Sequence, residues 1–137
     1  MNILLPPMAL IGLTFFCVAR LGYLRYAAVR DGSVDPRYYS SYQGFDEPEK
    51  LRIHSRHVLN LFEVPVLFYA ITLIAYVSET ATGTAVWLAW LYVVLRFLHT
   101  YVHLTSNIVL LRFRIFVFSV FTLAALWLVV GVNLLRH

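Results

Sequence analysis

The stretch "IFVFSVFTLAALWLVVGVNLL" (residues 115–135) carries no charged side chain, and apolar residues occupy every face of the helix that it would form. About 20 apolar residues are enough for a helix to cross roughly 30 Å of hydrocarbon, because each residue adds about 1.5 Å. A helix of a soluble bundle, by contrast, keeps one polar face. This stretch therefore predicts a membrane-spanning helix and excludes a soluble four-helix bundle.

The composition extends this prediction to the whole chain of 137 residues. Hydrophobic residues make up 61% of it and charged residues 13%, with a mean hydropathy of +0.74, which lies outside the range of soluble domains. Three more apolar stretches and their connections fill the remaining length. We therefore expect a single all-α integral membrane domain over residues 1–137, an up-and-down bundle of four transmembrane helices. The helices are expected at about 4–29, 48–77, 84–106 and 110–134, with a loop at about 30–47.

The distribution of basic residues predicts how the bundle is oriented. Lysines and arginines flank the first and third connections, whereas the second connection, "SETATGT" (78–84), has none. The positive-inside rule then places the first and third connections in the cytoplasm and both termini outside, across a bacterial inner membrane. The apolar start is followed, not preceded, by Arg20 and Arg25, so we expect it to stay as the first helix. Because topology accounts for the net charge of +4, we expect membrane lipids as partners and no nucleic acid.

Polar residues form a stripe on each of the second and third helices. The spacings are 4, 4 and 3 in the first set and 3, 4 and 4 in the second, so each set stays on one helix face at about 100° per residue. The two sets are Arg52, Arg56, Asn60 and Glu63, and Arg96, His99, His103 and Asn107. Both lie in the cytoplasmic halves of their helices, and we expect them to face each other or a neighbouring subunit.

The cost of placing these groups in a membrane favours a binding site over simple packing. A charged side chain at mid-membrane costs roughly 2.5–3.5 kcal/mol, so Glu63 needs a cation. Pro65 lacks a backbone N–H and frees the carbonyl of Leu61 beside the stripe. Polar contacts that only join helices need one or two groups, each worth about 1 kcal/mol. The two stripes hold more than that, so we expect them to line a polar site.

The two histidines of the third helix raise the question of a metal. His99 and His103 stand one turn apart, a spacing that suits a metal ion. The pattern offers no convincing third ligand, because Glu63 is the only carboxylate at that depth and His54 and His57 lie nearer the interface on uncertain faces. We therefore expect no metal. A proton relay through Glu63, His99 and His103 stays open as an alternative.

Three segments together resemble the MAPEG family, the membrane-associated proteins in eicosanoid and glutathione metabolism. They are "RHVLNLFEVP" (56–65), "RFLHTYVHLTSN" (96–107) and "LLRFR" (110–114). The resemblance covers nearly the whole chain in length, span order and polar placement. It implies a homotrimer with three sites at subunit interfaces that open to the cytoplasm. In glutathione-using members, each site holds glutathione in a bent form and activates its thiol.

The resemblance also implies roles for individual residues. Asn60 and Glu63 match the amide and the acid that hold the peptide, and Arg56 matches the arginine one turn earlier. His99 matches the histidine of the third helix, and Arg112 matches the arginine at the start of the fourth helix that stabilises the thiolate. Glutathione brings two carboxylates, an ammonium and a thiol, for which arginines and one acid are suitable partners.

Three further residues complete the expected site. Arg25 matches a basic residue of the first helix, Arg96 shares the stripe of His99, and His103 can donate a hydrogen bond to sulfur. We thus expect Arg112 and His103 to be catalytic and the others to bind the cofactor. Two positions differ from glutathione-using members. Leu59 replaces a further arginine, and His103 replaces a tyrosine that many of them carry.

These residues lead to one preferred function and two alternatives. The preferred function is a transferase or peroxidase that uses glutathione or a related thiol on a lipophilic electrophile. Leu59 and His103 favour a non-enzymatic alternative, a scaffold or accessory subunit that binds an anionic lipid or a larger membrane complex. The third reading is ion or proton translocation, which would depend on Glu63.

Overall fold

The computed structural model describes residues 2–136, and all of the regular secondary structure in that range is helical. The helices are α1 (Leu5–Arg30), α2 (Tyr38–Ser41), α3 (Glu49–Phe62), α4 (Pro65–Val77), α5 (Gly83–Leu104) and α6 (Val109–Arg136). Four segments are long and apolar enough to cross a membrane, and α3 and α4 together make one of them, Glu49–Val77. The prediction of an all-α chain with four candidate membrane spans is confirmed.

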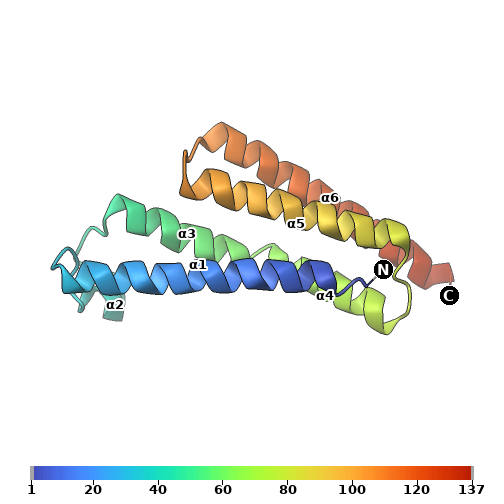
Figure 1. The fold of residues 1–137 in the computed structure, drawn as a ribbon, viewed down its shortest axis with the longest axis horizontal. Helices are drawn as coiled ribbons and strands as arrows, with labels where there is room; N and C mark the ends of the chain where they lie inside the picture. The colour runs from blue at the N-terminus through green and yellow to red at the C-terminus, as the bar shows by residue number, and fades with distance from the viewer. Residues whose placement is uncertain (1, 137) are drawn as a thin grey trace.

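The helices lie in two layers (Figure 1). One layer holds α1 beside α3 and α4, and the other holds α5 paired along its length with α6. The α4–α5 and α5–α6 turns are at opposite ends of the bundle, so successive spans run in opposite directions. Many large apolar side chains, among them Phe15, Phe121 and Leu128, are exposed on the single subunit. In a membrane protein such side chains face lipid or another protein chain.

The first connection is more ordered than the expected loop at about 30–47, because it contains the short helix α2. Within this connection Arg37 forms an ion pair with Asp35, 2.9 Å from Nη2 to Oδ2. It is the only ion pair among residues 2–136. Hydrogen bonds from Arg37 hold the pKa of the Asp35 carboxyl below its ordinary value. On α1, the Arg25 guanidinium lies over the Tyr39 ring, 5.3 Å from its centroid. This cation–π contact ties the connection to the bundle.

The single helix expected over 48–77 is broken into α3 and α4. Pro65 causes the break, because its ring has no N–H to donate and clashes with the carbonyl four residues earlier. Glu63 ends α3 with φ −87° and ψ −93°, outside the helical region. The chain resumes with Pro65 at the start of α4. The break leaves Glu63 exposed at the end of α3.

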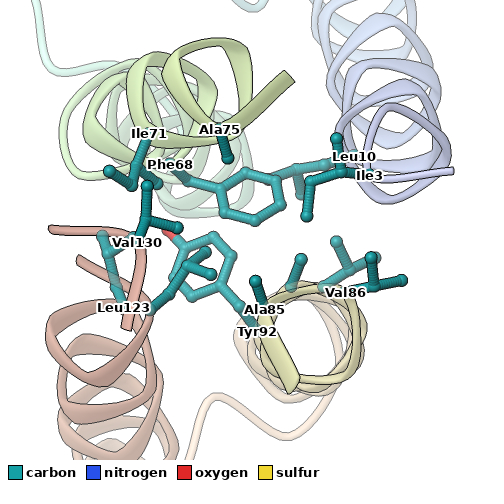
Figure 2. Packing of buried hydrophobic residues seen from close by; sticks show 13 residues of the cluster. Ile3, Leu10, Phe68, Ile71, Ala75, Ala85, Val86, Tyr92, Leu123 and Val130 are labelled. Carbon is teal, nitrogen blue, oxygen red and sulfur yellow. The ribbon is translucent and has the colours of Figure 1, made fainter. Parts of the chain in front are cut away.

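An apolar cluster fills the half of the bundle that holds α4 and the first turns of α5 (Figure 2). The rings of Phe68 and Tyr92 lie at its centre, with centroids 4.5 Å apart. Ala75 and Ala85 are fully buried and let the helices approach closely. The cluster is completed by buried side chains of the N-terminal segment and of α6: Ile3, Leu10, Leu123, Leu126 and Val130. We call this the apolar half, and we call the end that holds α3 and the α5–α6 turn the polar half.

Candidate functional site

Helix α3 has two different faces in the polar half. The buried residues are Leu51, His54, His57 and Leu61, and the exposed ones include Arg52, Arg56, Leu59 and Glu63. The buried set is spaced 3, 3 and 4, which is the pattern of one helix face. The sequence alone leaves the faces of His54 and His57 undecided, although their spacing from Leu51 and Leu61 is a usable signal. This face packs partly on α1, where Leu51 clusters with Leu21, and partly on α5, where His57 meets His103 and so joins the site.

Three histidines meet between α3 and α5, and we call His57, His99 and His103 the histidine cluster. Their exposed fractions are 0%, 2% and 5%. The Nδ1 atoms of His57 and His103 are 3.1 Å apart. The ring of His57 is stacked with that of His99 at 6.0 Å between centroids and meets that of His103 edge-on at 4.9 Å. Each ring offers one nitrogen within 4.8 Å of those of the other two.

Arg96 is fully buried one turn before His99. Its Nη2 donates to the backbone oxygen and to Oδ1 of Asn60, both at 3.2 Å, and so joins α5 to α3. Its guanidinium carbon lies 5.8 Å from the ring centroid of Phe116 on α6. The Nε and Nη1 atoms have no hydrogen-bond partner among the described residues. These two atoms can still donate to an acceptor. Because an unpaired buried donor costs free energy, a ligand that accepts from them would stabilise the site.

A cavity of about 200 Å³ collects residues of the site from three helices. We call it the arginine cavity, and it is lined by Asn60 of α3, His99 of α5, and Val109, Arg112, Phe113 and Phe116 of α6. Arg112 is half-buried, and its Nη1 donates to Oδ1 of Asn107 at 2.7 Å. Of the predicted site residues, the structure thus brings Asn60, His99 and Arg112 to one cavity.

The two predicted stripes do not face each other along their length. Asn60 and Arg96 are joined, but Arg56 and Glu63 are exposed on the outer face of the subunit. Glu63 has no ion-pair partner within residues 2–136 and is exposed, whereas His99 and His103 are buried, so the relay stays a prediction. The physical reason is that the apolar and histidine face of α3 packs inward, which leaves its charged groups outside. Inward packing of Arg56 would require a buried counterion.

Two other predicted residues lie away from the arginine cavity. Arg25 donates from Nη2 to Oγ of Ser55 at 3.2 Å, across the contact of α1 with α3. His103 lines a different cavity, of about 310 Å³, together with residues from the start of α3 and the α5–α6 turn. The residues of that cavity include Glu49, Lys50 and His54. The structure therefore separates His103 from the cavity that Arg112 lines.

The arrangement is suited to an anionic ligand. Guanidinium groups are always charged and bind carboxylates with paired hydrogen bonds. Arg96, whose Nε and Nη1 have no partner among the described residues, contacts Asn60 and Phe116 of the arginine cavity, and Arg112 lies on its wall. The apolar wall of Val109, Phe113 and Phe116 adds a surface for a hydrophobic group. A cavity with both features fits a ligand that is charged at one end and apolar at the other.

Comparison with known proteins identifies the family. No curated protein and no solved structure matches the chain. The model of the MAPEG family matches residues 3–132, which is nearly the whole chain. Together with four helices long and apolar enough to span a bilayer, this match shows an integral multi-pass membrane protein that belongs to the MAPEG family.

Proposed function

We propose that the protein is a homotrimeric transferase or peroxidase that binds glutathione at the arginine cavity and uses its thiol on lipophilic electrophiles. The observation that carries this proposal is the meeting of Asn60, His99 and Arg112 on one cavity with Arg96 behind it. The family, whose members include glutathione transferases, makes thiol chemistry the first expectation. Because fold alone does not decide activity, the site residues have to support the chemistry.

One carboxylate, the peptide and the sulfur of glutathione have suitable partners in this site. The free N–H groups of Arg96 fit a carboxylate, and the Asn60 amide fits the peptide. The Arg112 guanidinium on the cavity wall would hold the sulfur as thiolate, which is the nucleophilic form. The electrophile would enter from the membrane and pack on Phe113 and Phe116. Attack of the thiolate on an aryl halide forms a C–S bond and releases halide. On a lipid hydroperoxide the thiolate breaks the O–O bond and, with one proton, gives the alcohol and a sulfenic acid, which a second glutathione converts to the disulfide and water.

The outward side chains of α3 support a trimer. Arg56 and Glu63 are exposed within a candidate membrane span, where a charge that faces lipid costs roughly 2.5–3.5 kcal/mol. A neighbouring subunit placed against this face would remove that cost. It would also bring Glu63 to the ammonium and Arg56 to a carboxylate of a ligand bound at the interface. The site would then be completed only by assembly.

The polar half is proposed to face the cytoplasm of a bacterium. Basic residues gather around the first and third connections, which lie at this end of the bundle. The positive-inside rule puts that end inside and both chain termini outside. Glutathione is a cytoplasmic thiol, so the site would open toward its supply. A cysteine is introduced at position 43 in one variant and at position 81 in another, and intact cells are treated with a thiol reagent that does not cross the membrane. Labelling at position 81 and not at position 43 is expected for this orientation.

Ligand binding by the full-length protein in lipid nanodiscs tests the proposal. Glutathione at millimolar concentration should raise the melting temperature, and S-methylglutathione should do the same. Only glutathione should support turnover of an aryl halide or a lipid hydroperoxide. The proposal is refuted if neither glutathione nor S-methylglutathione changes the melting temperature and glutathione supports no turnover.

One observation favours a second candidate, a non-enzymatic subunit that binds an anionic lipid headgroup or a partner complex. Leu59 is 64% exposed on the face where glutathione-using members carry an arginine, and His103 is drawn into the histidine cluster. The same arginines would then hold a phosphate. Native mass spectrometry distinguishes the two. A retained phospholipid or a co-purified larger complex, with no glutathione adduct, selects the second candidate.

A further inference from the structure

The histidine cluster has a composition that helix packing alone does not explain. Two helices contribute three nearly inaccessible imidazoles, His57 from α3 and His99 and His103 from α5. Histidine is rarely placed in an apolar interior without a partner. The described residues place no carboxylate in hydrogen bond to any of the three rings. Their one mutual polar contact joins Nδ1 of His57 to Nδ1 of His103.

Unpaired nitrogens mark this cluster as incomplete. Nε2 of His57 and Nδ1 of His99 are buried and have no hydrogen-bond partner among residues 2–136. His54 lies one turn earlier on the same face of α3, yet its Nδ1 contacts the backbone oxygen of Lys50 at 2.8 Å. Nε2 of His54 is also buried without a partner among these residues, so an unpaired nitrogen alone does not distinguish the cluster. What distinguishes it is that three rings from two helices are turned toward one another, where one bound group would be a partner for all of them.

The distances fit a metal ion. Two nitrogens on one tetrahedral ion stand about 3.3 Å apart, because each bond is about 2.0–2.1 Å long. The 3.1 Å between the Nδ1 atoms of His57 and His103 is close to that value. The third nitrogen, from His99, is within 4.8 Å of the others. Rotation of one imidazole would bring it into the same coordination sphere.

We propose that His57, His99 and His103 form a binding site for one divalent transition-metal ion per subunit, with zinc as the best-fitting metal. Imidazole nitrogens suit zinc and its neighbours in the first transition series, and zinc accepts three histidines in tetrahedral geometry. The cluster provides no fourth protein ligand among the described residues. The fourth position is open to water or to an anion. His99 also lines the arginine cavity, whereas His57 and His103 lie off it, and metal binding by the three imidazoles requires no thiol chemistry.

The charges around the cluster favour an anion as the fourth ligand. Arg96 precedes His99 by one turn, and Arg112 shares a cavity with His99, so the local charge is already positive. A bound divalent cation raises that charge further, and an anionic ligand offsets it. Hydroxide, a carboxylate or a thiolate meets this need. The cavity of about 310 Å³ that His103 lines provides an entry path from the end of the bundle that holds the α5–α6 turn.

Metal content of the full-length protein in nanodiscs tests the site directly. The protein is stripped with a chelator, reloaded with Zn²⁺ or Co²⁺ and freed of excess metal. About one zinc per chain should remain, and Co²⁺ should give the visible absorption of a tetrahedral complex. His57→Gln keeps the size of the side chain and removes a ligand. It should weaken metal binding by more than the roughly 10–100-fold that loss of an outer-shell partner costs.

His54→Gln is the matched control, because His54 is buried on the same helix face and lies outside the cluster. It should keep one metal per chain and an unchanged Co²⁺ spectrum. If His57→Gln does not fold, His103→Gln replaces it with the same expectation. Wild-type protein that retains no zinc and gives no tetrahedral Co²⁺ spectrum overturns the proposal. Equal loss of metal in the His54 and His57 variants does so as well.

Discussion

The apolar half and the polar half of this bundle use the same helix α5 in opposite ways. In the apolar half, the Phe68 ring lies tilted against the Tyr92 ring and small alanines close the gap between helices, while the Tyr92 hydroxyl is buried without a hydrogen-bond partner among the described residues. In the polar half, Arg96, His57 and His99 are equally buried but keep nitrogens without partners. Apolar packing stabilises a fold, whereas a buried guanidinium and two imidazoles without full hydrogen bonding reduce its stability more than a single hydroxyl does. We infer that the apolar half holds the subunit together and that the polar half is kept for a ligand.

The largest expected effect is a loss of stability when the packing of the apolar half is disrupted. Phe68→Ala removes a ring with no exposure from the centre of the cluster. Truncation of a buried phenylalanine costs about 3–5 kcal/mol of the free energy of unfolding. Thermal unfolding of the detergent-solubilised protein measures it. Phe121→Ala is the matched control, since Phe121 is 69% exposed on α6. An equal loss in both variants would show that the cluster is not the main source of stability.

The second effect concerns activity in the polar half and should leave stability unchanged. Arg112→Ala removes the proposed thiolate partner, and within residues 2–136 the Arg112 side chain makes one hydrogen bond, to Asn107. Loss of one preorganised hydrogen-bond donor to an anion lowers kcat by about 10²–10³-fold. Arg114→Ala, two residues away and exposed, should retain full activity. Steady-state rates with glutathione and an aryl halide compare the two variants. A similar rate in both would remove Arg112 from the mechanism.

The two halves also differ in how well the sequence predicts them. Residues 115–135 and the other apolar stretches predict four spans, because the number of apolar residues needed to cross a bilayer is fixed. The family is predicted from three polar segments and is confirmed over residues 3–132.

The candidate site is predicted less completely. Arg56 and Glu63 share a helical stripe with Asn60, but periodicity does not say which face of α3 turns inward. The break at Glu63 and the burial of His57 depend on contacts with α5, which only the tertiary structure provides. The sequence leaves the face of His57 undecided, so it does not predict a third imidazole beside His99 and His103.

The third effect is a gain in stability, whereas substitution of a buried residue usually destabilises a protein. Arg96→Met should raise the free energy of unfolding by about 1 kcal/mol, because it removes a buried charge that lacks partners for Nε and Nη1. Loss of the hydrogen bonds to Asn60 offsets part of the gain. Glutathione affinity should fall by at least about 10-fold, in line with one charge-assisted hydrogen bond. Arg96→Lys keeps the charge and should not be stabilised. Strong destabilisation by Arg96→Met would mean that a neighbouring subunit pairs this guanidinium.

The smallest effect tests whether the polar half extends across a subunit boundary. Leu59 is exposed beside Asn60, on the face that a neighbouring subunit would cover. Leu59→Arg restores the arginine of glutathione-using members and should raise glutathione affinity by about 5–10-fold, near 1 kcal/mol, as expected for a partly solvated pair with a carboxylate. Leu59→Gln has a neutral polar side chain and should not raise it. Isothermal titration of both variants measures the difference. An unchanged affinity in Leu59→Arg would mean that the ligand does not reach this face, and would favour the non-enzymatic candidate, in which the arginines hold a headgroup inside one subunit.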